Sequence, residues 1–147
     1  TLWTYARSAR VQPGVVLTMP EDAVRSAVAR LVAAELPADA ADVYGQLVVY
    51  STTIFHVRFA TNERDLADFL KSSPALPNLL IPGQRPLTTP EGPPLGWWRP
   101  DDLNAVAGVV CAWPAAEDQV ACRVMSGRRG DRITVYMQFT IERGPRG

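Results

Sequence analysis

Prolines are concentrated in the stretch from Pro74 to Pro100, which holds eight of the chain's thirteen. Proline has no backbone N–H and a fixed φ, so this stretch excludes both a regular helix and a central strand of a sheet. We expect an extended loop that runs over the protein surface across residues 74–100. The regular secondary structure must therefore lie before and after this loop.

A first helix is predicted over residues 20–36. Thr18 and Glu21 form a capping-box pattern at its start, and Pro37 ends it. One side of this helix is apolar, because the following residues recur at helical spacing: Val24, Ala27, Val28, Leu31 and Val32. Such a helix packs its apolar side against another element.

A second helix is predicted over residues 62–71. Thr61 or Asn62 can cap it, since both side chains carry an oxygen that accepts a hydrogen bond from the first turn. Its apolar side consists of Leu66, Phe69 and Leu70.

Five runs of β-branched, aromatic and other apolar residues indicate strands, over residues 44–50, 54–60, 106–113, 120–125 and 133–141. The last run alternates most regularly. Its apolar positions are Ile133, Val135, Met137, Phe139 and Ile141, and its polar positions are Thr134, Tyr136, Gln138 and Thr140. This alternation predicts an antiparallel strand with one buried face and one solvated face.

Together these elements predict a single α+β domain over residues 1–147. We expect an antiparallel sheet of about five strands with two helices packed on one face, in the order α-β-β-α-loop-β-β-β. Residues 1–17 form an N-terminal extension in this prediction, and residues 74–100 form the surface loop. A chain of 147 residues is long enough to bury a core of its own.

The two cysteines, Cys111 and Cys122, allow only one pairing. They flank a hairpin turn that we place between Ala116 and Glu117, so that residue 111 faces residue 122 and Trp113 faces Val120. Residues that face each other across an antiparallel pair lie within the distance that a disulfide tolerates. A disulfide would indicate an oxidising compartment, and two free, buried thiols are the alternative. The alignment of the two positions favours the disulfide.

The charge balance argues against nucleic-acid binding, because fifteen basic residues offset fifteen acidic ones. No uncharged apolar run approaches the roughly 20 residues that span a bilayer. The chain begins at Thr1 without a methionine. We therefore expect that a signal sequence or a membrane anchor has been lost before residue 1.

Few residues suit catalysis. His56 is the single histidine, and two cysteines with one histidine cannot build a zinc site of the usual kind. The sequence holds no nucleophile elbow, no Gly-rich phosphate loop and no Cys-x-x-Cys. We predict no catalytic residue, no metal and no cofactor. A small hydrolase that uses His56 with Ser51, Thr53 or a carboxylate is the alternative.

Short motifs from Pro20 onward resemble a group of uncharacterised bacterial exported or lipoprotein domains. The motifs are Leu36-Pro37-Ala38-Asp39-Ala40, Val57-Arg58-Phe59, Asp65-Leu66-x-x-Phe69-Leu70, Trp97-Trp98 and Val135-Tyr136. The resemblance implies an α+β domain outside the cytoplasm, in the periplasm or at the cell surface. It implies no assigned activity and carries no catalytic residues.

Four residues are candidates for contact with a partner protein: Trp97, Trp98, Arg99 and Tyr136. Exposed Trp, Tyr and Arg side chains are enriched in interfaces, although the two indoles could instead pin the loop onto the sheet. We predict a non-catalytic, extracytoplasmic protein-interaction domain, an accessory subunit of a membrane-associated complex. An inhibitor or immunity protein of a secreted enzyme is the alternative within the class of binding proteins.

Overall fold

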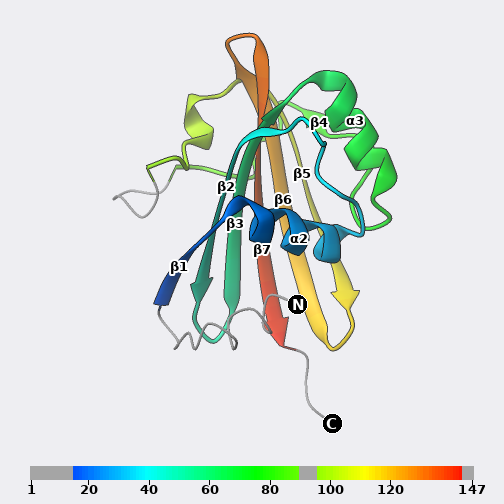
Figure 1. Ribbon diagram of the computed structural model, residues 1–147. Coiled ribbons are helices and arrows are strands. Elements are labelled where there is room, and N and C mark those ends of the chain that lie inside the picture. The colour runs from blue at the N-terminus through cyan, green and yellow to red at the C-terminus, as the bar shows by residue number, and fades with distance from the viewer. Residues whose placement is uncertain (1–14, 90–95, 144–147) are drawn as a thin grey trace.

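The computed structural model describes residues 15–89 and 96–143, and these residues form one seven-stranded antiparallel sheet with two α-helices (Figure 1). The strands lie in the order β1-β2-β3-β7-β6-β5-β4. Their bounds are β1 Val15–Met19, β2 Ala41–Val49, β3 Thr53–Thr61, β4 Ile81–Pro82, β5 Asn104–Ala115, β6 Asp118–Arg129 and β7 Arg132–Arg143. The helices are α2, Glu21–Val32, and α3, Glu63–Ser72, and a short 3-10 turn covers Pro100–Asp102.

The predicted fold class is wrong in strand number and order. The described chain runs β-α-β-β-α-β-β-β-β and is mostly sheet. Part of β1 lies in the predicted N-terminal extension, and β4 lies in the predicted proline-rich loop. Both are edge strands, where a short run with one pairing partner leaves a weak sequence signal. Pro82 fits in β4 because an edge strand needs no N–H donor on its free side.

The ends of the two helices show which of the predicted capping and stop signals the structure uses. Asn62 caps α3 as predicted, since its Oδ1 accepts a hydrogen bond from the Asp65 N–H at 2.8 Å. The predicted cap of α2 is wrong, because Thr18 lies in β1 and no side chain caps that helix at Pro20. Helix α2 ends at Val32, earlier than the predicted end at Pro37. The next residue, Ala33, adopts a left-handed conformation with φ of 55°.

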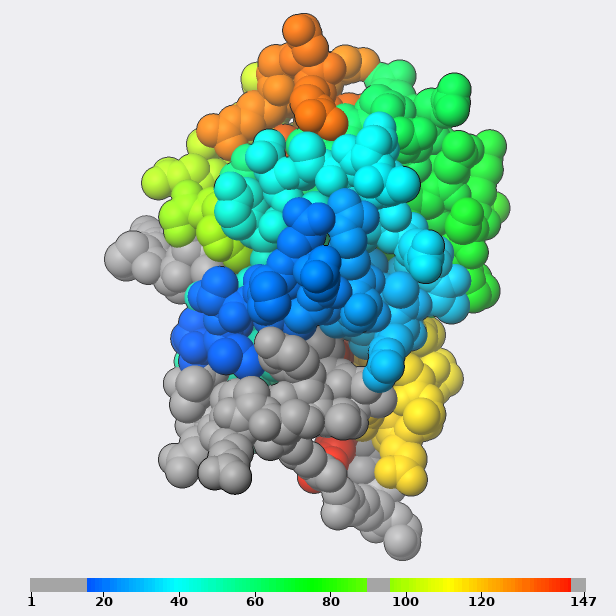
Figure 2. Space-filling view, viewed as in Figure 1, coloured from blue at the N-terminus to red at the C-terminus, as the bar shows by residue number. Residues whose placement is uncertain are grey.

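Both helices pack on the same face of the sheet, which we call the helix face. Figure 2 shows α2 covering the middle of this face, with α3 beside it. Val24, Val28 and Val32 of α2 and Leu66, Phe69 and Leu70 of α3 join one buried cluster with the sheet. The sheet contributes alternate residues of its strands to the cluster, among them Leu47, Phe55, Val57, Phe59, Val135, Met137 and Phe139. This cluster is the main core.

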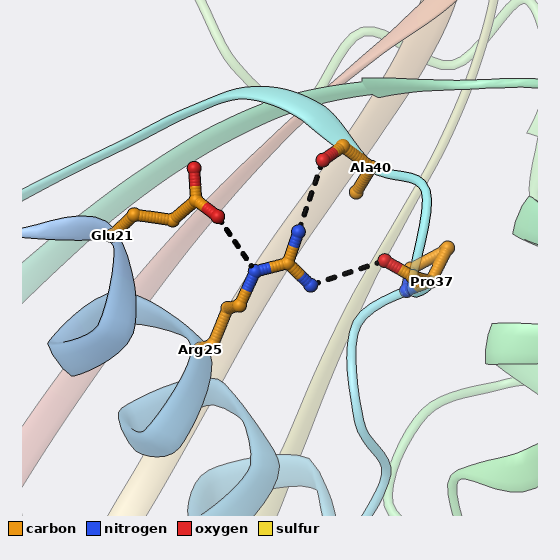
Figure 3. Close-up of polar contacts among 4 residues, drawn as sticks. All are labelled: Glu21, Arg25, Pro37 and Ala40. Atoms are coloured by element: carbon orange, nitrogen blue, oxygen red, sulfur yellow. Dashed lines mark hydrogen bonds and ion pairs between the residues drawn. The ribbon is translucent and has the colours of Figure 1, made fainter.

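Arg25 ties α2 to the segment that leads into β2 (Figure 3). Its Nε contacts the Glu21 carboxylate at 3.0 Å, and its two terminal nitrogens donate to the carbonyls of Pro37 and Ala40 at 3.1 and 2.9 Å. A planar guanidinium has donors in fixed directions and can hold three acceptors at once. One side chain therefore fixes the turn between helix and strand.

Gly45 allows α2 to approach β2 closely. A Cβ atom at this position would lie 2.3 Å from a methyl group of Val24 and 3.3 Å from the ring of Phe55. Both contacts are side chains of the main core, where little space is free.

We expect Gly45→Ala to lower the free energy of unfolding by about 1–3 kcal/mol, because the added methyl group overpacks the contact with Val24. Gly96→Ala is the control, since no atom lies within 4 Å of a Cβ there. Urea denaturation of both variants measures the difference. Equal stability of the two would contradict the close packing of α2 on β2.

Candidate functional site

The sheet face opposite the helices, which we call the second face, carries an aromatic cluster. The strand register aligns Tyr44, Arg58 and Tyr136 on β2, β3 and β7. Trp97 stacks on Tyr44 at 5.6 Å between ring centroids, and Trp98 meets Tyr136 edge to face at 5.0 Å. The Arg58 guanidinium lies 5.5 Å from the Tyr44 ring and 6.0 Å from the Tyr136 ring. These five residues define the aromatic cluster.

Hydrogen bonds in the aromatic cluster fix the end of the proline-rich loop on the sheet. The Tyr136 hydroxyl accepts from the Arg99 N–H at 3.3 Å and donates to the Trp97 carbonyl at 3.4 Å. Arg58 donates to the same carbonyl at 3.1 Å. The Trp98 indole N–H donates to the Thr88 carbonyl at 3.3 Å. The contacts hold two parts of the loop, on either side of residues 90–95, together.

The four predicted partner-contact residues lie close together but differ in exposure. Trp98 is 3% exposed and Tyr136 is fully buried, so neither side chain offers surface to a partner in this structure. The prediction of a solvated outer face for β7 is wrong at Tyr136, because the loop covers it. For Trp98 and Tyr136 the contacts support the alternative that they pin the loop. Trp97 is half-buried and Arg99 is exposed, and their contact with a partner stays a prediction.

His56 lies beside the aromatic cluster, on β3. The side-chain nitrogen of Gln138 lies 3.3 Å from its Nε2, and the Trp98 ring meets the imidazole edge to face at 4.7 Å. Burial lowers the His56 pKa from 6.5 to about 4. Among the described residues, Ser51, Thr53 and all carboxylates are absent from its hydrogen-bond partners. No contact here supports the hydrolase alternative.

Three polar atoms near His56 are buried without a protein hydrogen-bond partner in the described part of the chain. They are Nδ1 of His56, Oε1 of Gln46 and Nε of Arg58. The register places Gln46 next to His56 across β2 and β3. Buried polar groups of this kind are usually satisfied by ordered water.

The predicted cysteine hairpin is confirmed in its register. Cys111 faces Cys122, Trp113 faces Val120, and the turn falls at residues 116–117. Both thiols are free. Burial raises the Cys122 pKa well above its usual range, whereas a hydrogen bond from Cys122 lowers that of Cys111. Whether oxidation joins the two sulfurs stays a prediction.

The second face also carries a row of uncharged side chains beyond the aromatic cluster. The register aligns these residues across six strands, in the order Val16, Val48, Ile54, Thr140, Ala121 and Ala112. We call them the apolar row. Val16 is 50% exposed, and Val110, in the neighbouring row, is 60% exposed. The solvated face of an antiparallel sheet is normally polar, so this composition is unusual.

A groove of about 390 Å³ lies on the helix face, between α3 and the segment of residues 78–80. Its floor consists of small residues of β5 and β6, including Ala107 and Ser126, and its walls carry Leu66, Leu70 and Leu79. An ion pair between Arg128 and Glu63 lies at its rim. The size is in the range of small-molecule sites, but Ser126 is the only lining residue that is both polar and buried, which is fewer polar groups than such sites usually hold.

No protein-family model matches the chain, and searches of curated proteins and of solved structures found no match. Within residues 15–89 and 96–143, no helix is long and apolar enough to cross a membrane. The same residues contain no group of three or more His, Cys, Asp or Glu side chains that could hold a metal ion. The resemblance to exported bacterial domains stays a prediction.

We expect the protein to lose stability as the pH falls from about 6.5 to 4. The folded-state pKa of His56 lies below its unfolded value, so the unfolded chain binds the extra proton in this window. The loss attributable to His56 is about 2–3 kcal/mol. Urea denaturation at several pH values measures it, and the NMR signal of the single histidine reports the pKa.

His56→Gln is the control for this pH dependence, because glutamine keeps a polar side chain that does not titrate. The variant should lose the part of the pH dependence that lies between 6.5 and 4. A histidine signal that titrates near 6.5 in the folded protein would contradict the burial of the ring.

We expect Trp98→Ala to lower the free energy of unfolding by about 3–5 kcal/mol, since the buried indole anchors the loop. Arg99→Ala should change it by less than about 0.5 kcal/mol, because Arg99 is exposed. Chemical denaturation measures the free energy of unfolding of both variants. If Trp98 only met a partner, its removal would leave stability close to that of the wild type.

Proposed function

We propose that this protein is a non-catalytic protein-interaction domain that binds another protein on the uncovered part of its second face. The observation that carries the proposal is the apolar row. Six neighbouring positions on six strands hold valine, isoleucine, alanine or threonine where a solvated sheet would hold charged side chains. Val16, Ala112 and Ala121 are exposed, and Val48, Ile54 and Thr140 are half-buried. Apolar surface of this kind is typical of interaction sites.

The residues around the apolar row fit the usual anatomy of an interface, an apolar centre inside a polar rim. Arg123 lies one row away on β6, beside Gln138 of β7, and Val110 of β5 extends the apolar surface. Tyr50 lies at the end of β2 and is 53% exposed. Tyrosine and arginine are residue types that interfaces enrich.

The arginines on this side of the molecule favour a partner with acidic side chains. Arg123 donates to the Pro86 carbonyl at 3.4 Å, and Arg99 donates to the Gly96 carbonyl at 3.3 Å. Neither forms an ion pair among the described residues, where the ion pairs join Arg25 to Glu21, Arg64 to Asp65 and Arg128 to Glu63. A carboxylate of the partner would therefore meet an available guanidinium at the rim.

The proposal keeps the predicted setting of an extracytoplasmic accessory subunit of a membrane-associated complex. In this proposal Trp97 and Arg99 lie at the margin of the interface, next to the aromatic cluster. Trp98 and Tyr136 would act on binding only indirectly, by holding the loop in place.

A photo-crosslinking amino acid at Ala121, in the middle of the apolar row, tests the proposal in the source cells. The same amino acid at Ser26, which is exposed on α2 of the opposite face, is the control. We expect one protein to be captured from position 121 and not from position 26. Its affinity for the purified domain is then measured by calorimetry.

Ala121→Arg should weaken binding of the captured protein by about tenfold or more, because it places a charge in the apolar centre. Ser26→Arg should leave the affinity within about twofold. Thermal melting confirms that both variants fold. Equal capture from both positions, or unchanged binding by Ala121→Arg, would refute the proposed surface.

A further inference from the structure

Among the described residues, most of β5 pairs with another strand on one side only. The strand is twelve residues long, but β4 pairs with it only at Ala107 and Gly108. Beyond Gly108 no strand of the described residues pairs with this side of β5, which is the outermost strand there in Figure 1. We call residues 109–115 the free edge.

Backbone groups of the free edge point outward at alternate residues. The Gly83 N–H donates to the Val106 carbonyl at 2.8 Å, and Ile81 lies opposite Gly108, so even-numbered residues face the β4 side. The same alternation along β5 means that Val110 and Ala112 each direct an N–H and a carbonyl away from β6, toward the free side of the strand. Pro114 directs a carbonyl only. Five main-chain groups are therefore available to an added strand.

The side chains of the free edge do not block an added strand. Natural edges are usually protected by lysine, by proline, by inward-pointing charge or by a covering segment, and here Pro114 limits pairing only at the end of the free edge. Residues 109–113 contain no charge. Val109, Cys111 and Trp113 lie half-buried at the margin of the main core, and Val110 on the opposite face is 60% exposed. An added strand would extend the apolar surface on both faces.

A second copy of the chain fits this edge poorly. In one possible dimer, the two β5 strands pair antiparallel with Ala112 of one copy opposite Ala112 of the other, and most of the outward groups form hydrogen bonds. This register places Ala116 of the second copy opposite Gly108, where Ile81 already lies. In a second register, Trp113 of one copy lies opposite Trp113 of the other, and the second copy does not overlap β4. Ala112 then lies opposite Pro114, which has no N–H to donate. The β4 strand and Pro114 thus disfavour a dimer, while a flexible segment can turn away before it meets Ile81.

We propose that the free edge binds an extended segment of another protein, which pairs antiparallel with residues 110–114 of β5 as an eighth strand. Main-chain hydrogen bonds to Val110, Ala112 and Pro114 fix its register. The side chains of the segment that point to the helix face are apolar, because they lie beside Cys111 and Trp113. The free edge meets the apolar row at Ala112, but it binds through main-chain groups of β5, and the inference does not require the row to bind.

Hydrogen exchange of the free protein tests the edge first. The amides of Val110 and Ala112 should exchange at least tenfold faster than those of Cys111 and Trp113, which face β6. Equal protection of all four amides would show that the edge is covered and would overturn the proposal. Protection of Val110 and Ala112 that increases with protein concentration would point to self-pairing and would overturn it as well.

A library of random twelve-residue peptides displayed on phage is the binding probe. We expect the selected peptides, made synthetically, to alternate apolar residues and to slow exchange of the Val110 and Ala112 amides by tenfold or more. A library without binders, or binders that leave these two amides unprotected, would refute the inference.

Ala112→Pro removes the central outward N–H without touching the hydrogen bonds to β6, and should weaken peptide binding about tenfold. Ala112→Val is the matched control, because it changes the side chain and keeps the N–H, and should leave binding within about threefold. Ser26→Arg, at an exposed position of α2, should leave peptide binding within about threefold. Undiminished binding by Ala112→Pro would contradict strand addition.

Discussion

The pairing of β3 with β7 is the constraint on which the rest of the structure depends. Nine consecutive residue pairs, from Thr53 opposite Ile141 to Thr61 opposite Ile133, join the N-terminal strands to the C-terminal meander. This single register decides which side chains share a face. It brings Phe55 to Phe139 in the main core and, on the opposite side, Arg58 to Tyr136 in the aromatic cluster. A shift by one residue would exchange the two sets.

Local signals in the sequence predicted local structure well. The turn at residues 116–117 set Cys111 opposite Cys122, and Asn62 capped the helix that follows it, because each depends on neighbours a few residues apart. The pairing of β3 with β7 has no such signal, since alternation shows that a strand has two faces but not which strand lies beside it. The edge strands β1 and β4 were missed for a related reason. Each is short and pairs on one side only.

In the candidate site, a segment distant in the sequence determines whether a residue is exposed or buried. Tyr136 occupies a position that alternation assigns to solvent, yet the proline-rich loop brings Trp98 onto it from about forty residues away in the sequence. Trp98 also packs against His56, and the burial of Trp98 and Tyr136 leaves Trp97 and Arg99 as the predicted contact residues that reach the surface. Proline content correctly excluded regular structure from most of this loop, but nothing in its composition revealed which sheet face it would cover.

The two proposed binding surfaces follow from the width of the sheet. Seven strands spaced about 4.8 Å apart present a face nearly 30 Å wide, whereas a helix with its side chains is about 10 Å across. Two helices cover the helix face, whereas on the second face the described part of the loop contacts the aromatic cluster and Arg123. At the edge, β4 covers only two residues of β5. Within residues 15–89 and 96–143 no helix or strand pairs with the outward side of the free edge or packs on the apolar row, and both surfaces therefore suit binding to another molecule.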